Sequence, residues 1–230
     1  LMADTKLAED SDTGLLREID EEIRQEHYEK LWKRYGKHVI AAAILLVVSV
    51  AGYKGWQSYD LSQRIASGQQ FSAAISAASA GDMEAAQTQL IALAENGTTG
   101  YQTLAKFRFA ALLSKQNDQA ASVQTYTAIA GDMDVPAEYR DLAVVLATMN
   151  SMDTANADEL VANLAPITDA ANPWRHTARE LSALALISAG NMDKAIEILA
   201  ALSSDTTAPA GTQQRAKELL AALGHPRGQS

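Results

Sequence analysis

The most distinctive pattern along the chain is a run of apolar residues without any charge. It extends from Val39 to Tyr53, and the nearest charged residues on its two sides are Lys37 and Lys54. As a helix this run covers about 24 Å, less than the roughly 30 Å hydrocarbon core of a bilayer. The two lysine side chains can extend toward the headgroups from both ends and close that gap. The pattern predicts a single transmembrane helix at residues 35–58.

Aromatic residues flank the apolar run on both sides, two before it and two after it. Tryptophan and tyrosine concentrate where hydrocarbon meets headgroups, because their rings are largely apolar and carry one polar group. We therefore predict that these four side chains and the two flanking lysines anchor the helix at the membrane interfaces. The predicted anchors are Trp32, Tyr35, Lys37, Lys54, Trp56 and Tyr59.

Basic residues are distributed unevenly around the run. Five lie close on its N-terminal side, whereas only Lys54 and Arg64 lie close on its C-terminal side. The five are Arg24, Lys30, Lys33, Arg34 and Lys37. Because the flank richer in lysine and arginine stays in the cytoplasm, we expect a cytoplasmic N-terminus and a C-terminal domain on the far side of the membrane. Two alternatives are a cleaved signal peptide, with small residues at Ser49-Val50-Ala51, and a buried helix of a soluble domain. The long acidic segment before the run argues against the first, and the aromatic flanks argue against the second.

The segment before the run, residues 1–34, is acidic and has a helical pattern. Leu16, Ile19 and Ile23 follow one another at three- and four-residue steps, which places them on one face of a charged helix. One interpretation is a cytoplasmic contact with a partner or with the bilayer surface. The other is a solvated, partly frayed helix that continues into the span.

Residues 59–230 show no strand-like alternation, and their turn signals recur. The three clearest turns are Gly81-Asp82, Gln116-Asn117-Asp118 and Gly190-Asn191, each followed by small residues. Ala86 and Ala121 are 35 positions apart, and Ala121 and Ala195 are 74 apart, so a weaker unit around residues 153–164 fits between them. Periods of this size are typical of stacked helical hairpins. The fold class predicted is all-α.

These units resemble degenerate tetratricopeptide repeats, in which a glycine ends the first helix, an alanine follows five residues later and a large residue four after that. Two units match, through Gly81, Ala86 and Leu90 and through Gly190, Ala195 and Leu199. The second unit departs from the pattern, with Gln116 for the glycine and Thr125 at the large position. The resemblance implies an amphipathic helix that continues into the transmembrane helix, followed by a right-handed solenoid of such hairpins.

The layout of the whole chain is similar to the ancillary subunit of the Sec translocon. The features that carry this likeness are an acidic helix ending in Leu31-Trp-Lys-Arg-Tyr-Gly36, one span, alanine-rich repeats, Asn172-Pro-Trp-Arg175 at a late helix, and a capping helix at residues 212–223. The resemblance implies that the protein is anchored in the bacterial inner membrane with its repeat domain in the periplasm. It also implies that the protein binds the translocon and works beside periplasmic chaperones such as an anchored prolyl isomerase. An accessory subunit or assembly factor of another inner-membrane complex, such as a respiratory complex, is the alternative.

Composition narrows the function further. The formal net charge is −9, and from Ser58 onward 11 basic residues face 18 acidic ones, which disfavours nucleic acid as a partner. The chain has no cysteine, and its four histidines are far apart without metal-ligand spacing. We expect no enzyme, no cofactor and no small-molecule substrate, but binding to proteins and to the bilayer. Trp174 and Arg175 are candidate contacts, because tryptophan and arginine are enriched in binding hot spots; the alternative for Trp174 is a buried residue at the start of a helix.

Overall fold

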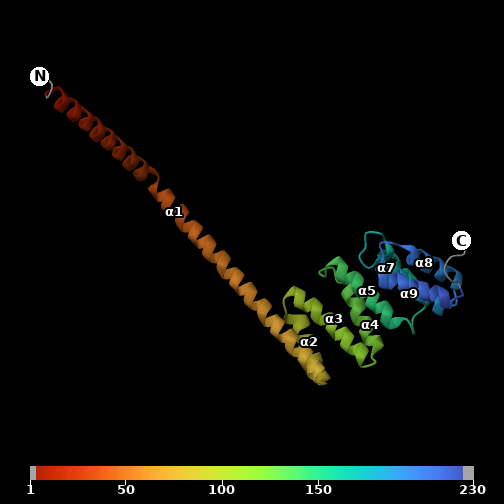
Figure 1. The fold of residues 1–230 in the computed structure, drawn as a ribbon. Coiled ribbons are helices and arrows are strands. Elements are labelled where there is room, and N and C mark those ends of the chain that lie inside the picture. Colours follow the sequence, from red (N-terminus) through yellow and green to blue (C-terminus); the bar gives the residue numbers. More distant parts are fainter. Residues whose placement is uncertain (1–3, 225–230) are drawn as a thin grey trace. The chain divides into compact units, whose positions relative to one another are not determined.

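The computed structural model describes the backbone of residues 4–224 and the side chains of residues 30–224. In that part of the chain all regular structure is helical, as the sequence predicts. The helices are α1 (Asp4–Ser79), α2 (Met83–Asn96), α3 (Thr99–Lys115), α4 (Gln119–Gly131), α5 (Ala137–Ser151), α6 (Ala157–Leu164) with the short 3-10 helix η1 (Ala165–Thr168), α7 (Arg175–Ser188), α8 (Met192–Ser204) and α9 (Ala210–Ala222) (Figure 1).

Helix α1 is far longer than a transmembrane helix requires. It spans 76 residues, so the amphipathic segment does continue into the apolar run without a break, and the helix then extends to Ser79. The segment contains no proline, and glycine within a helix costs only about 1 kcal/mol because its N–H still donates to the helix. The chain divides into two compact units, Leu1–Ser62 and Gln63–Ser230, and α1 belongs to both. The predicted boundary at residue 58/59 therefore lies within a continuous helix.

The larger compact unit, Gln63–Ser230, is built from four helical hairpins, each of which is one repeat. The second helices of these repeats share one pattern of buried positions. The residue preceding α2, α4, α6 and α8 is Asp82, Asp118, Asn156 and Asn191 respectively. These positions are 36, 38 and 35 residues apart. In every unit the residues four, eight and eleven positions later are at most 3% exposed. They are Ala86, Leu90 and Leu93; Ser122, Tyr126 and Ile129; Leu160, Leu164 and Ile167; and Ala195, Leu199 and Leu202.

This shared pattern corrects the register that we inferred for the second unit. Ser122 and Tyr126, not Ala121 and Thr125, occupy the small and large buried positions. The backbone before the cap residue supports the same register. Gly81 and Gly190 adopt the left-handed conformation there, with φ of +86° and +75°, and in the second repeat Asn117, not Gln116, does so with φ of +62°. Asparagine tolerates this conformation better than most residues other than glycine. The second unit therefore departs from the repeat less than its sequence indicated.

The hydrophobic cores are shared between neighbouring hairpins. The first core joins Ala74 of α1 and Leu90 of α2 to Leu112 of α3, and the fourth joins Ala183 of α7 and Leu199 of α8 to Ala216 of α9. The second and third cores join α3, α4 and α5 and then α5, α6 and α7 in the same way. Each second helix thus packs between the first helix of its own hairpin and the first helix of the next. Helix α9 covers the last core.

The C-terminal turns of α1 are part of the first repeat. Ser67 is 5% exposed, and its hydroxyl accepts a hydrogen bond from the backbone N–H of Thr98 at 3.2 Å. A side chain at Gly68 would begin only 2.8 Å from the Tyr101 hydroxyl, so glycine permits this close approach. Phe71 packs against the Tyr101 ring with 6.1 Å between centroids. The docked part of α1 therefore begins near Ser67.

Ser122 provides a test of the repeat register. It is fully buried, and its hydroxyl has no hydrogen-bond partner among the described residues, whereas Ala86 and Ala195 occupy the same position in other repeats. Ser122→Ala removes an unsatisfied hydroxyl and improves helix propensity, so it should raise the free energy of unfolding by about 1 kcal/mol. A urea titration of the full-length protein in mild detergent, monitored by circular dichroism, measures this change in the free energy of unfolding.

The matched control is Ser151→Ala, because the Ser151 hydroxyl donates to the Ala147 carbonyl at 2.8 Å. That substitution loses a hydrogen bond and should not stabilise the protein. Equal stabilisation by both substitutions would mean that the effect is general helix propensity, and a loss of stability in Ser122→Ala would contradict the register.

Candidate partner-binding surfaces

The apolar run of α1 is exposed on every side of the helix. All side chains at residues 39–53 are exposed, with Leu45 at 69% and Val48 at 64%. An 18-residue window of this helix has a mean hydropathy of 1.8 and none of it is buried. Leaving apolar surface in water costs roughly 25 cal/mol per Å², and soluble proteins rarely expose continuous apolar patches of this extent. Within the described residues, this one helix is long and apolar enough to cross a membrane.

The six predicted interface anchors are all exposed on α1. Trp32 lies over Gly36, where an added Cβ would approach the indole to 3.2 Å, and Arg34 lies 5.6 Å from the centre of the Tyr35 ring. At the other end, the Lys54 ammonium donates to the Gln57 side-chain carbonyl at 3.5 Å. Aromatic rings and long cations thus lie at both ends of the apolar run, as an interfacial role requires. That role stays a prediction.

The predicted cytoplasmic stripe falls on a part of α1 whose side chains are not described. Leu16, Ile19 and Ile23 lie on the helical backbone, but their side chains are outside the described residues. Whether this stripe contacts a partner therefore stays a prediction from the sequence.

Trp174 is half-buried at the start of α7. It packs against the core of Val145, Leu164, Ile167, Ala178 and Leu181, and its indole N–H donates to the Glu138 carbonyl at 2.9 Å. Its backbone N–H donates to the Asn172 side chain at 2.8 Å. These contacts give the ring the packing role that we considered as the alternative to partner binding. A partner contact through its exposed part stays a prediction.

Arg175 belongs to a polar cluster between the start of α7 and the loop after α8. Its guanidinium donates to the Asn172 carbonyl at 3.2 Å and to the Thr207 hydroxyl at 3.3 Å. Thr207 donates from both its hydroxyl and its backbone N–H to Asp205, at 2.6 and 2.9 Å. Arg179 lies 3.6 Å from the same carboxylate. Trp174 therefore connects the start of α7 to α5 and the third core, and Arg175 connects it to the loop after α8.

His176 lies inside this cluster and is only 6% exposed. Its Nδ1 is 3.5 Å from an Asp205 carboxylate oxygen and has no hydrogen-bond partner, and its Nε2 is 3.5 Å from the Thr207 hydroxyl. Burial and the nearby Arg175 charge lower the pKa of His176 below its usual 6.5, against the opposing effect of Asp205. Hydrogen bonds from Thr207 hold the pKa of Asp205 below its usual 3.8. No local pattern in the sequence indicates this cluster, because its members come from α7 and from the loop after α8.

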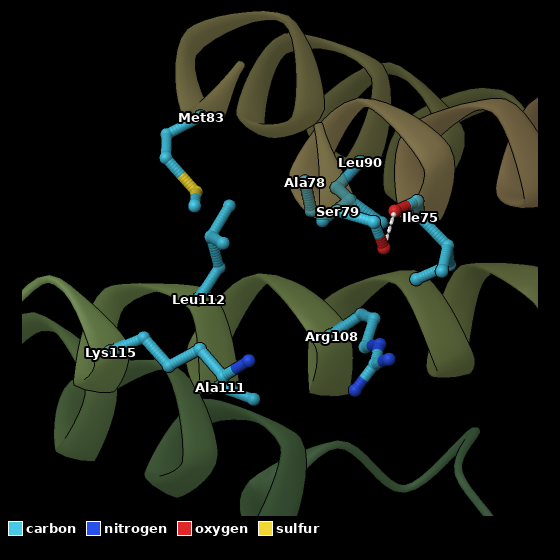
Figure 2. Close-up of a pocket in the computed structure, with 9 residues that line it drawn as sticks. All are labelled: Ile75, Ala78, Ser79, Met83, Leu90, Arg108, Ala111, Leu112 and Lys115. Atoms are coloured by element: carbon cyan, nitrogen blue, oxygen red, sulfur yellow. Dashed lines mark hydrogen bonds between the residues drawn. The ribbon is translucent and has the colours of Figure 1, made fainter. Parts of the chain in front are cut away.

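A further hollow lies between the first hairpin and α3. One wall consists of Ile75, Ala78 and Ser79 of α1 with Met83 and Leu90 of α2, and the other consists of Arg108, Ala111, Leu112 and Lys115 of α3 (Figure 2). The cavity has a volume of about 100 Å³. Its lining is mostly apolar, and two basic side chains extend from one wall. We refer to these nine residues as the α1–α3 groove.

The family comparison agrees with this geometry. A family model described as a tetratricopeptide repeat-like domain matches residues 29–207, which is more than half of the chain. This chain belongs to the tetratricopeptide repeat-like domain family. No curated protein and no solved structure matches it.

The matched range of the tetratricopeptide repeat-like domain begins before the apolar run and ends after α8. It therefore includes the apolar helix as well as all four hairpins. Domains of this kind are generally non-catalytic scaffolds for protein–protein interaction. Among the described residues, no group of three or more histidine, aspartate or glutamate side chains could hold a metal ion.

The buried His176 predicts a pH dependence of the repeat domain's stability. Because its pKa is lower in the folded state than in the unfolded chain, the unfolded state binds the proton more readily. The free energy of unfolding should therefore decrease as pH falls below about 6.5, toward the lowered folded-state pKa. His176→Gln cannot titrate and should flatten this part of the profile. Urea unfolding of the full-length protein in detergent between pH 7 and pH 5 checks it.

His38→Gln is the control, because His38 is exposed on α1. This variant should keep the slope of the unaltered protein. An unchanged slope in His176→Gln would mean that other groups determine the pH dependence. The contribution of Asp205 belongs to a lower window, because a depressed carboxyl pKa contributes stability that is lost as pH falls below about 4.

Proposed function

We propose that this protein is a single-pass inner-membrane scaffold that binds other proteins through its tetratricopeptide repeat-like domain on the periplasmic side. The observation that carries this proposal is α1 itself. Its exposed apolar run has the composition of a membrane anchor, and its last turns supply Phe71 and Ala74 to the first repeat core. One helix therefore contributes both to the proposed anchor and to the repeat domain.

The proposed orientation rests on the charges that flank the apolar run. Arg24, Lys30, Lys33, Arg34 and Lys37 precede it, against Lys54 and Arg64 close behind it. The positive-inside rule then assigns residues 1–34 to the cytoplasm and residues 59–230 to the periplasm. An acidic repeat domain without cysteine suits an oxidising compartment, where a free thiol is a liability.

The absence of cysteine makes this orientation simple to test. We expect that Ser188→Cys, at an exposed site near the end of α7, reacts with a membrane-impermeant maleimide in intact spheroplasts. Ser11→Cys, in the N-terminal segment, should react only after the membrane is permeabilised. The unaltered protein has no thiol and gives the background of the labelling.

Reaction of both cysteines in intact spheroplasts would mean that the chain does not cross the membrane. The reverse pattern would mean that the repeat domain is cytoplasmic, and recovery of the protein in the soluble fraction would remove the anchor from the proposal altogether.

The partner complex that we favour is the Sec translocon, together with a periplasmic chaperone such as an anchored prolyl isomerase. The support for it is the similarity in layout: an acidic N-terminal helix, one span and alanine-rich repeats. The proposed activity is scaffolding without catalysis, which agrees with the general role of such domains.

Purification of the tagged, full-length protein from native membranes in mild detergent tests this assignment. Translocon subunits and a periplasmic isomerase should remain bound in near-equal amounts, as measured by quantitative mass spectrometry. A tagged variant truncated after residue 62 retains the apolar run and lacks the repeat domain, so it separates partners of the two units. Retention of respiratory subunits in place of translocon subunits would transfer the proposal to a role in that complex.

A further inference from the structure

The α1–α3 groove differs from the surrounding surface in both shape and charge. Its floor consists of Leu90 and Leu112, which are 1% and 5% exposed, and the small side chains of Ala78 and Ala111 in its walls leave the space above that floor open. A volume of about 100 Å³ is far more than one water molecule needs. The groove therefore has room for one large apolar side chain.

Both basic residues of the groove lack an internal partner. Arg108 and Lys115 are exposed, and neither forms a hydrogen bond or an ion pair with another described residue. Lys106, on the same helix, shows the contrast, because its ammonium lies 2.8 Å from the Asp132 carboxylate. None of the nine groove residues is acidic, although the domain as a whole has a negative net charge. The groove is thus a local site of positive charge.

The spacing of the two cations defines what they can bind. Arg108 and Lys115 are seven residues apart on α3, which places them on one face and about 10 Å apart along its axis (Figure 2). In an extended peptide every second side chain lies on the same face and each residue advances about 3.3 Å, so carboxylates four positions apart share a face and lie about 13 Å apart. The long, flexible side chains of Arg108 and Lys115 can span the remaining difference. An apolar side chain between them then lies over the apolar floor.

We propose that the α1–α3 groove binds an extended acidic segment of a partner protein, with a leucine-sized side chain in the cavity and carboxylates on Arg108 and Lys115. This proposal rests on the scaffold function above and assigns a part of its binding surface. The two cations repel basic segments, and the apolar cavity favours segments that carry a leucine-sized side chain.

The direct test uses a fluorescein-labelled peptide, Gly-Glu-Ala-Leu-Ala-Glu-Gly, in which both glutamates and the leucine lie on one face of an extended chain, and full-length protein in a neutral detergent at low salt. Fluorescence anisotropy should show saturable binding, and Arg108→Glu combined with Lys115→Glu should weaken it by about tenfold or more. Lys194→Glu is the matched control, because Lys194 is an exposed cation of α8 outside the groove. This control should bind the peptide as the unaltered protein does.

Two further changes separate the apolar contribution from the charge. Ala111→Leu fills the cavity without altering any charge and should weaken the same peptide. A peptide with alanine in place of leucine, and another with glutamine in place of both glutamates, should each bind less tightly than the parent. Circular dichroism and thermal unfolding of every variant verify that the repeats remain folded.

Several results would overturn the proposal. They are no saturable binding by the unaltered protein, equal binding by the groove variants and Lys194→Glu, or equal binding of all three peptides. If phosphatidylglycerol vesicles bind and the peptide does not, with vesicle binding lost in the groove variants, the occupant is a lipid and not a peptide.

Co-purification separates this proposal from the scaffold function. If the double groove variant retains every partner of the unaltered protein, the groove proposal fails and the scaffold function stands. If the unaltered protein retains no partner, the scaffold function itself fails.

Discussion

The repeat domain depends on one packing constraint: a single hairpin cannot bury the large side chains of its own second helix. Leu90 and Leu93 of α2 contact α1 on one side and are covered by α3 on the other. The same holds for Leu199 and Leu202, which lie between α7 and α9. Each hairpin therefore depends on the first helix of the next hairpin to cover its large side chains, and the stability of each repeat includes its interface with its neighbour.

Helix α1 combines two different solvation requirements in one element. Its apolar run is exposed all around, whereas between Ser67 and Ser79 only one side is packed, through Ser67, Phe71 and Ala74. A helix satisfies its own backbone hydrogen bonds in either surrounding, so the same secondary structure serves in a bilayer and in a protein core. Only the side chains change along its length. This continuity makes α1 both a candidate anchor and the first element of the binding domain.

Polar interactions have different roles at the two ends of the repeat domain. Near its C-terminal end, Arg175, Arg179 and Arg215 each engage internal acceptors, and Arg215 donates two hydrogen bonds to the buried Glu180 carboxylate. These contacts fix α7, α8 and α9 to one another. In the α1–α3 groove, Arg108 and Lys115 have no such acceptor among the residues that the structure describes. The C-terminal cations therefore contribute to stability, and those of the groove are available to a ligand.

The correction in the second repeat shows where sequence reasoning reached its limit. Counting from alanine to alanine aligned Ala121 with Ala86, although the buried position is occupied by Ser122. Serine is small enough for that position, as alanine is, but a polar residue there is not recognised by a search for repeated alanines. Counting from the acidic or amide cap gives the correct alignment in all four units, because the cap fixes the start of the helix and the helix period fixes which residues turn inward.

The sequence by itself determined the all-helical fold, the hairpin repeats and the helix able to cross a membrane, because these follow from local periodicity and from one long uncharged run. It also placed Trp174 and Arg175 at the start of a helix. Only the tertiary structure revealed the continuity of α1 to Ser79, the buried His176 beside Asp205, and the α1–α3 groove. The buried His176 and the groove depend on residues that are distant along the chain and adjacent in space. Such neighbours are chosen by packing between helices, which no local pattern records.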